Sequence, residues 1–423
     1  RKHLQQRTGD KHNIEMRLDH ILKDSGAEII QGSSKVEVDA ICSDSRKVTA
    51  GSMFVAIKGY AFDGHEYISL AVGKGARVIV YEDQEALDRQ TLPPNLDGIV
   101  LIKAESSRYA LAIMAANFYD NPSHKLTLVG ITGTNGKTTT VTLLYRMFTA
   151  LGYSCGLLST IANYVGAKGT EAVNTTSDPL TINSLLNEMV NAGCEYCFME
   201  VSSIGVEQER VEGLKFKVGI FSNLTHDHLD YHKTFAEYLR CKKLFFDRLP
   251  SDAIAVTNVD DRNGMVMVQN TKARIKTYSV RSMADFRAKI IECHFEGMYL
   301  DIDGREVGVQ FIGKFNVSNL LAVYGAACML SKDPHEVLVA MSAMTPVSGR
   351  FEALRSPEGY TAIVDYAHTP DALENVLNAI HDVLDGKGDV ITVCGAGGNR
   401  DKGKRPLMAQ EAAKQSDKVI ITS

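Results

Sequence analysis

Residues 128–140 read Leu-Val-Gly-Ile-Thr-Gly-Thr-Asn-Gly-Lys-Thr-Thr-Thr, and this stretch decides the fold. The apolar run that ends at Ile131 predicts a buried strand, and residues 141–151 predict a helix. Between them, a glycine-rich turn lets successive N–H groups converge on an anion at the N-terminus of the new helix. Lys137 adds a cation for the β- and γ-phosphates, and the Thr138 hydroxyl suits Mg²⁺. The stretch predicts a phosphate-binding loop, although Ile131 stands where the G-x-x-x-x-G-K-[ST] pattern has its first glycine.

The composition limits the class of protein. The formal net charge of −5 argues against a general nucleic-acid-binding or anionic-membrane-binding surface. The sequence contains no run of about 18 apolar residues, and its first residues lack the apolar core of a signal peptide. Eight scattered cysteines without a disulfide framework are typical of a reducing cytoplasm. We therefore expect a cytoplasmic protein that neither binds nucleic acid nor inserts into a membrane.

The order of expected elements divides the chain into blocks. Residues 1–13 are expected to form a disordered tail, 14–123 an N-terminal α/β domain, 124–345 the domain with the phosphate loop, and 346–423 a third α/β domain. Apolar strands alternate with helices in the central block, which favours a parallel sheet covered on both faces. The third block alternates strand and helix from residue 361 to 422, and it is small for an independent α/β domain, so it is expected to be incomplete.

Polar residues follow several of the expected strands. Glu200 ends a strand near the phosphate loop, where it is either a Mg²⁺ ligand or a solvated strand-end residue. Residues 226–232 hold three histidines and two aspartates, a pattern that favours one metal-bound histidine with helix-capping aspartates. Asn258 suits a nucleotide base or ribose contact, or else begins an Asx turn.

Cationic residues occur in three further segments. The expected helix 234–246 carries Arg240, Lys242 and Lys243, which by charge alone predict a solvated face. Arg350 is a candidate phosphate ligand, and Asp365 lies at the end of a third-block strand. The segment 395–406, which includes Arg400, favours recognition of an anion or a carboxylate.

Together these motifs resemble the Mur ligases, ATP-dependent amide-forming enzymes of peptidoglycan precursor synthesis. The resemblance extends from about residue 14 to the C-terminus. The stretches that carry it are Asp44-Ser-Arg46, Phe54-Val-Ala56, Asp63-Gly-His65, Gly133 to Thr138, Asn174-Thr-Thr176, Glu200-Val-Ser-Ser203 with Gln208 and Arg210, Asp227 to Tyr231, Asp365 to Pro370, and Arg400 to Pro406. The resemblance implies an α/β, three-domain architecture: a small N-terminal uridine-binding domain, a central P-loop domain with a parallel sheet, and a Rossmann-like C-terminal domain.

The resemblance also implies an activity and its participants. We expect an ATP-dependent ligase that adds a diamino acid, meso-diaminopimelate or L-lysine, to the D-glutamate of UDP-MurNAc-L-Ala-D-Glu through an acyl phosphate. The implied cofactors are ATP, two Mg²⁺ ions and CO₂ bound as a lysine carbamate on Lys242, and the implied state is a monomer. The motif that selects the diamino acid in the family would fall beyond Ser423, which leaves that choice open. Ile204 stands where relatives usually carry His.

The implied site residues fall into four groups. Catalysis is assigned to Lys137, Lys242, His228 and Glu200. The expected ATP ligands are Gly133, Thr134, Asn135, Gly136, Lys137, Thr138, Thr139, Asn258, Asn319, Arg350 and Asp365. The expected substrate ligands are Ser45, Arg46, Asn174, Thr175, Thr176, Ser202, Gln208, Arg210 and Arg400. The expected metal ligands are Thr138, Glu200, His228 and the carbamate of Lys242.

Two other functions remain open at this point. A ligase similar to folylpolyglutamate synthetase would share the ATP-binding core, but it would lack the Asp44-Ser-Arg46 block. A non-catalytic nucleotide-binding regulator would keep the phosphate loop, but it has no reason to retain Glu200, His228 and Lys242 together.

Overall fold

The computed structural model describes residues 16–93, 96–225, 229–396 and 402–422. Its contacts divide the chain into two compact units. The first unit comprises Arg1–Pro122, Asp178–Ser184 and Gln208–Leu214, and the second comprises Ser123–Ser177, Leu185–Glu207 and Lys215–Ser423. The expected tail, residues 1–13, lies outside the described residues. Within the described ranges, no helix is both long and apolar enough to cross a membrane.

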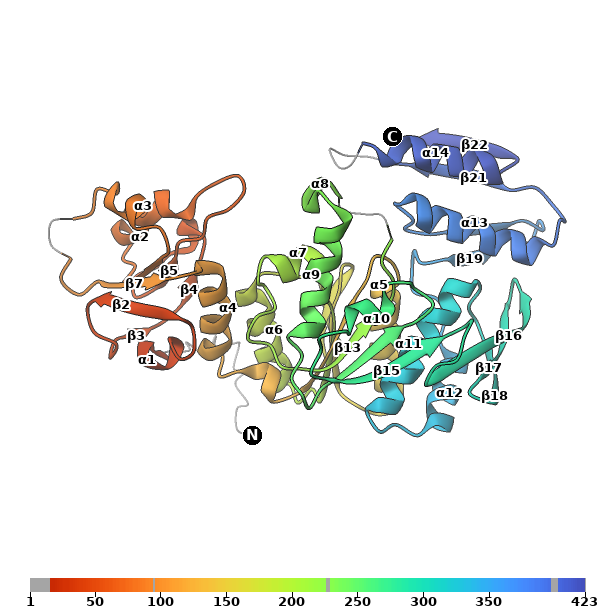
Figure 1. The fold of residues 1–423 in the computed structure, drawn as a ribbon, viewed down its shortest axis with the longest axis horizontal. Coiled ribbons are helices and arrows are strands. Elements are labelled where there is room, and N and C mark those ends of the chain that lie inside the picture. The colour runs from red at the N-terminus through yellow and green to blue at the C-terminus, as the bar shows by residue number, and fades with distance from the viewer. Residues whose placement is uncertain (1–15, 94–95, 226–228, 397–401, 423) are drawn as a thin grey trace, which may run out of the picture. The chain divides into compact units, whose positions relative to one another are not determined.

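The first unit is built on a five-stranded sheet of order β2-β7-β6-β5-β4 (Figure 1). The strands are parallel except β2, which pairs antiparallel with β7 at one edge. Alternate residues of β6 enter two different cores: Val80 packs on the side of α4, and Ile79 packs on the side of α2. The elements are β1 (Met16–Arg17), α1 (Leu18–Ile21), β2 (Ala27–Gln31), β3 (Glu37–Val38), β4 (Ile41–Cys42), β5 (Met53–Val55), α2 (Ile68–Gly73), β6 (Val78–Tyr81), α3 (Gln84–Asp88), β7 (Val100–Ala104) and α4 (Ser107–Phe118).

An eleven-stranded sheet forms the centre of the second unit, with the order β11-β10-β9-β12-β8-β13-β14-β15-β16-β17-β18. Neighbouring strands from β9 to β16 are parallel, as the alternation of strands and helices predicts. The hairpins at both edges are antiparallel; β9 to β11 form one of them and β16 to β18 form the other. These strands are β8 (Thr127–Thr132), β9 (Cys155–Leu158), β10 (Ala162–Val165), β11 (Lys168–Glu171), β12 (Tyr196–Glu200), β13 (Phe216–Phe221), β14 (Ile254–Asn258), β15 (Arg274–Ser279), β16 (Phe286–His294), β17 (Gly297–Ile302) and β18 (Arg305–Val309).

Helices cover both faces of this sheet. Val129 and Ile131 of β8 share a core with α5 and α11, whereas the intervening Gly130 faces Phe216 and Phe245, the latter on α9. The helices are α5 (Lys137–Ala150), α6 (Pro179–Asn191), α7 (Ser203–Glu207), α8 (Leu229–His232), α9 (Phe235–Asp247), α10 (Gly264–Met267), α11 (Lys314–Met329) and α12 (Pro334–Ala343).

The third block differs in one respect from the expected strand–helix series. The strand predicted at 361–365 does not join the two later strands; it pairs antiparallel with β19, which the sequence did not predict. The two later strands pair in parallel with each other, and a small core under α13 and α14 contains Leu377 and Met408. The elements are β19 (Glu352–Arg355), β20 (Thr361–Val364), α13 (Pro370–Leu384), β21 (Ile391–Gly395), α14 (Lys404–Gln415) and β22 (Lys418–Thr422).

Candidate active site

The phosphate loop connects β8 to α5, and two glycines determine its shape. Gly136 has φ +86°, a conformation that L side chains rarely adopt, and it directly precedes α5. A Cβ atom on Gly136 would collide with Asn319 Oδ1, and one on Gly133 would collide with Ser222 Oγ. Both positions therefore require glycine. The loop leads into a helix of 14 residues, whose N-terminus favours an anion.

Lys137 folds back over this loop. Its Nζ donates to the carbonyl oxygens of Gly133 at 2.8 Å and Thr134 at 2.9 Å. These bonds hold the ammonium group against the loop, where a cation attracts a polyphosphate. Thr138 and Thr139 are both buried in the first turn of α5.

Three polar residues to which the sequence analysis gave no role, Ser222, Asn223 and Tyr238, hold the phosphate loop through hydrogen bonds. Asn135 N donates to Asn223 Oδ1 at 2.8 Å, and Ser222 Oγ donates to the Asn135 carbonyl at 2.7 Å. The hydroxyls of Thr134 and Tyr238 lie 3.0 Å apart. Ser222 and Asn223 follow β13 directly, so the signal that singled out Glu200, a polar residue where a buried strand ends, would also have found them.

Glu200 ends β12 and is 1% exposed, so its interpretation as a solvated strand-end residue is wrong. Its carboxylate is buried because β12 lies beside β8 in the parallel sheet, with Glu200 opposite Ile131. Thr138 Oγ1 donates to Glu200 Oε1 at 2.8 Å, and Thr160 donates to the same carboxylate through its N at 2.9 Å and its Oγ1 at 3.1 Å. A carboxylate and a hydroxyl side by side at the phosphate loop are ligands that Mg²⁺ prefers.

Three expected substrate residues lie around Glu200. Thr175 Oγ1 lies 3.1 Å from Thr160 Oγ1, whose proton is donated to Glu200. Thr176 Oγ1 donates to the Glu200 carbonyl at 3.0 Å and accepts from Ser202 N at 2.9 Å. Ser202 Oγ accepts from Gly205 N at 3.0 Å, at the start of α7. Asn174, the fourth residue of this group, is exposed.

The prediction of a solvated cationic face on α9 is wrong for Lys242. Lys242 is 1% exposed, and its Nζ donates to the Gly133 carbonyl at 2.8 Å and lies 3.5 Å from Thr132 Oγ1. Its Nζ also lies 4.8 Å from the centre of the Tyr238 ring. Arg240 is exposed, as expected, and pairs with Glu237, whereas the Lys243 side chain is only 15% exposed and pairs with Asp247.

The buried positions of α9 explain why Lys242 turns inward. Residues 238, 241, 242, 245 and 246 are buried, which is the i, i+3, i+4, i+7, i+8 stripe of a helix packed on a core. Lys242 therefore occupies a core-facing position. A lysine within an apolar stripe is a sequence signal that would have separated it from its neighbours.

The Asx-turn interpretation of Asn258 is confirmed. Asn258 Oδ1 accepts from Asp260 N at 3.0 Å, and its Nδ2 donates to the Ser222 carbonyl at 2.7 Å. Asp261 Oδ2 accepts from Leu224 N at 2.7 Å. A cavity of about 600 Å³ lies beside this turn, and its wall is formed by Leu224, Thr225, Phe235, Asp260, Asp261 and Arg262. Because Thr225 N donates to Thr134 Oγ1 at 3.0 Å, the cavity adjoins the phosphate loop.

Two predicted ATP ligands of the third block lie at or near the loop. Arg350 Nη2 donates to Thr138 Oγ1 at 3.2 Å, and its guanidinium carbon lies 4.6 Å from the centre of the Tyr366 ring. Asp365 Oδ2 accepts from Phe351 N at 2.7 Å, next to Arg350 in the chain. Burial raises the pKa of Asp365 above its ordinary value. The structure thus adds a third-block cation to the residues around Thr138.

The remaining described substrate candidates belong to the first unit. Ser45 is buried, and Lys74 Nζ donates to its carbonyl at 3.0 Å. Arg46 is exposed, and its guanidinium hydrogen-bonds to Asp44, which lowers the pKa of that carboxyl to about 2. Gln208 and Arg210 also fall in this unit, where Arg210 Nη2 donates to Gln208 Oε1 at 2.7 Å.

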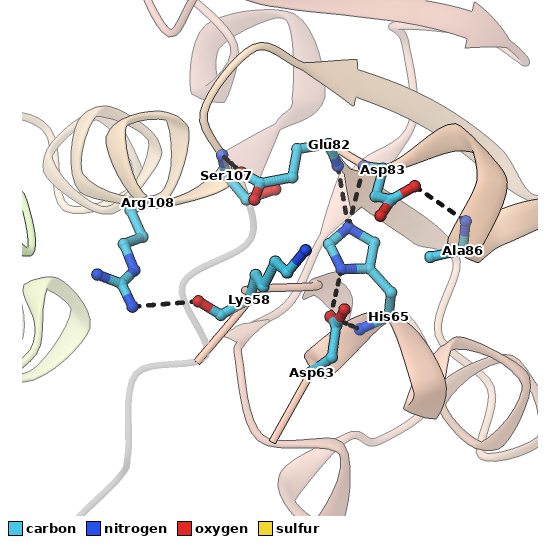
Figure 2. Close-up of polar contacts among 8 residues, drawn as sticks. All are labelled: Lys58, Asp63, His65, Glu82, Asp83, Ala86, Ser107 and Arg108. Atoms are coloured by element: carbon cyan, nitrogen blue, oxygen red, sulfur yellow. Dashed lines mark hydrogen bonds and ion pairs between the residues drawn. The ribbon is translucent and has the colours of Figure 1, made fainter. Parts of the chain in front are cut away.

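A buried histidine links three segments of the first unit (Figure 2). His65 is 0% exposed, and its Nδ1 lies 2.6 Å from Asp63 Oδ1. Its Nε2 accepts from the backbone N of Glu82 at 3.1 Å and of Asp83 at 3.3 Å, so the proton resides on Nδ1 and is donated to Asp63. Glu82 Oε2 in turn accepts from Ser107 N, at the start of α4, at 2.7 Å. His65 therefore fixes the loop after β5 against the residues that precede α3, and Glu82 connects these residues to the start of α4.

Two predicted site residues, His228 and Arg400, lie outside the described residues. Within the part of the chain that the structure describes, no three His, Cys, Asp or Glu side chains gather into a metal-binding group. The predicted metal ligands that it does describe are Thr138, Glu200 and Lys242.

Comparison with protein-family models assigns all three parts of the chain to one family. Residues 37–119 match the model described as Mur ligase family, catalytic domain. Residues 131–327 match the Mur ligase middle domain, and residues 349–423 match the Mur ligase glutamate ligase domain.

Known proteins agree with this assignment. The UDP-N-acetylmuramoyl-L-alanyl-D-glutamate–2,6-diaminopimelate ligase of Phocaeicola vulgatus is 59% identical over 409 residues, which cover 96% of this chain and 83% of the relative. The ligase of the same name from Parabacteroides distasonis is 58% identical over 398 residues, 94% of this chain and 80% of the relative. A solved structure of a ligase of that name superimposes with a TM-score of 0.74 at 27% identity, covering 96% of this chain and 82% of that one. The chain belongs to the Mur ligase family.

Proposed function

We propose that this chain joins 2,6-diaminopimelate to the D-glutamate of UDP-N-acetylmuramoyl-L-alanyl-D-glutamate at the expense of ATP. The observation that carries the proposal is a phosphate loop with a buried carboxylate, Glu200, and a buried lysine, Lys242, at its rim. The names of two relatives, 59% and 58% identical to this chain over the aligned residues, support the choice of substrates.

The proposed reaction has two steps. A γ-carboxylate oxygen of D-glutamate attacks the γ-phosphorus of ATP, which forms an acyl phosphate and releases ADP. The amine of the incoming amino acid then attacks the acyl carbon, loses a proton and expels inorganic phosphate, which leaves the amide. Lys137, Arg350 and the N-terminus of α5 are suited to neutralise charge on the transferred phosphoryl group.

We assign a magnesium site to the rim of the loop. Thr138 and Glu200 supply oxygen ligands, and His228 and a carbamate on Lys242 complete the predicted set for two ions. When bound, Mg²⁺ neutralises phosphate charge and orients the triphosphate. The position of Lys242 supports the carbamate proposal, because its Nζ lies against the loop and not in solvent. A carbamate would convert a buried cation into an anionic oxygen ligand.

The first unit is assigned to the uridine nucleotide, through Ser45 and Arg46. The muramoyl dipeptide is assigned to Asn174, Thr175, Thr176, Ser202, Gln208 and Arg210, and the incoming amino acid to Arg400. We also propose domain boundaries at residues 14, 124 and 346. The proposed state is a monomer and the proposed location is the cytoplasm.

Release of ADP in the presence of defined substrates tests the reaction. The purified chain is incubated with ATP, Mg²⁺ and UDP-MurNAc-L-Ala-D-Glu, together with meso-diaminopimelate, L-lysine or neither. We expect ADP release and a new tripeptide product with diaminopimelate. Turnover with a folate and glutamate instead would indicate the folylpolyglutamate synthetase alternative, and ATP binding without any ligation would indicate a regulator.

Peptide mass spectrometry tests the carbamate. At neutral pH the peptide that contains Lys242 is expected to carry one added CO₂, which acid removes. Lys243, which pairs with Asp247, serves as the internal control and is expected to stay unmodified. An unmodified Lys242 in the enzyme saturated with magnesium and nucleotide would contradict the assignment.

A further inference from the structure

One contact of the phosphate loop has no role in the chemistry described above. Asn135, in the middle of the loop, donates from Nδ2 to Asp371 Oδ2 at 3.0 Å. Asp371 lies 236 positions away, in the first turn of α13. The bond therefore joins the loop between β8 and α5 to a helix of the third block.

Both ends of this bond are held in place. Thr369 is fully buried and caps α13, because its Oγ1 accepts from Ala372 N at 3.2 Å, and Pro370 fixes the first helical position. At the other end, the backbone of Asn135 is bonded to Ser222 and Asn223 at the end of β13. The side chain of Asn135 thus connects a backbone anchored to the central sheet with a carboxylate anchored to α13.

The position of Asn135 makes this connection relevant to nucleotide binding. Asn135 directly precedes Gly136, whose positive φ turns the chain into α5. A restraint on Asn135 is therefore a restraint on the peptide groups that present their N–H donors to a phosphate. Asp371 is half-buried, and this burial raises the pKa of its carboxyl above the ordinary value.

We propose that Asp371 is a positioning residue for ATP, which fixes the phosphate loop through Asn135 and thereby makes nucleotide affinity depend on the attachment of α13. The inference rests on the proposed function, in that the loop binds ATP. It adds a residue of the third block that acts on the nucleotide through the loop.

Simple electrostatics makes the opposite prediction. A carboxylate near a triphosphate repels it, so the removal of that charge would tighten ATP binding. Positioning predicts weaker binding when the hydrogen-bond acceptor is lost, and nearly normal binding when an uncharged acceptor replaces it. The sign of the effect therefore separates the two explanations.

The test measures ATP affinity by isothermal titration calorimetry in the intact chain. Asp371→Ala is expected to weaken ATP binding by about tenfold, the order of magnitude of one hydrogen bond to a charged group. Asp371→Asn keeps an acceptor for Asn135 Nδ2 and is expected to remain within about twofold of the unmodified chain. Glu374→Gln is the matched control, because it removes an exposed carboxylate one turn further along α13 and is expected to leave affinity unchanged.

A double-mutant cycle with Asn135→Ala shows whether Asp371 acts through Asn135. We expect Asn135→Ala to weaken binding as much as Asp371→Ala does, and the double variant to be no weaker than either single variant. In steady-state ligation, the KM for ATP is expected to rise while kcat changes much less. Asp371→Ala is replaced in the test if circular dichroism shows that it does not fold. Asn135→Ala is then expected to weaken ATP binding, and Asp371→Asn is expected to leave it within about twofold.

Unchanged or tighter ATP binding by a folded Asp371→Ala variant would overturn the inference, and so would additive effects in the cycle. Failure of the unmodified chain to bind ATP or to ligate would instead overturn the proposed function. The unmodified chain therefore distinguishes the two failures before any variant is compared.

Discussion

Three cations within four residues of α9 have different surroundings, and one of them adjoins the phosphate loop. Arg240 and Lys243 each pair with a carboxylate on the same helix, whereas Lys242 is enclosed between Tyr238 and the Gly133 carbonyl. Residue type and charge do not distinguish the three. Their positions on the helix do distinguish them, because only residue 242 lies in the buried apolar stripe of α9. The chemistry at this residue thus follows from helix geometry.

Lys137 is expected to be necessary for ATP turnover but not for folding. Its ammonium group bonds to the loop carbonyls of Gly133 and Thr134, and its side chain is not part of an apolar core, so Lys137→Ala removes a charge from the loop. We expect ADP release to fall by more than tenfold, which corresponds to about 1.4 kcal/mol of transition-state stabilisation, and the melting temperature to stay unchanged. Turnover within tenfold of the unmodified chain would contradict this role.

His65 is expected to contribute stability to the first unit. His65→Ala leaves the N–H groups of Glu82 and Asp83 and the carboxylate of Asp63 without their ring partner. A buried polar group without a partner costs about 1–3 kcal/mol, so the free energy of unfolding should fall by at least that amount. Urea denaturation measures the change, with His294→Ala as the control because that histidine is exposed. Equal midpoints for the two variants would contradict a structural role for His65.

At the scale of elements, the sequence identified those with strong periodicity. The strand and the helix that flank the phosphate loop are present as the sequence predicts, although α5 begins at Lys137, four residues before the expected start at residue 141. The hairpin strands β10 and β11 were missed, because all four residues of β11 are exposed and carry no apolar alternation. The pairing of β20 with β19 was missed because pairing depends on contacts between strands, which periodicity within one strand does not encode.

The packing of β8 on α9 predicts a specific intolerance at Gly130. A Cβ atom there would lie 2.6 Å from Phe216 Cε1 and 2.9 Å from Phe245 Cζ, so Gly130→Ala overpacks this face of the sheet. The expected loss is about 1–3 kcal/mol of unfolding free energy. Gly73→Ala on α2 is the control, since nothing lies within 4 Å of its Cβ position and its φ is not in the left-handed range. Thermal unfolding of both variants should show a lower midpoint only for Gly130→Ala.

At the scale of the whole molecule, the candidate site follows from the order of strands in the large sheet. The strands β12, β8, β13 and β14 are consecutive neighbours, and their C-terminal ends carry Glu200, the phosphate loop, Ser222 and Asn258. Parallel strands bring such ends to one edge, so polar residues after apolar runs predicted a shared site. The sequence did not predict that Asp371 would join them, because that contact depends on how α13 packs against the loop.

The division into two compact units predicts two separable responses to ligands. The phosphate loop lies in the second unit and Ser45 in the first, so a non-hydrolysable ATP analogue is expected to raise the unfolding temperature of one calorimetric transition, and UDP that of the other. A ligand at a hundred times its dissociation constant stabilises the unit that binds it by about 2.7 kcal/mol, which differential scanning calorimetry resolves. Lys137→Ala is the matched control, since it should abolish the shift with the ATP analogue and retain the shift with UDP. A single transition that both ligands raise equally would show that the two units unfold together, because a ligand bound to either unit would then stabilise the whole chain.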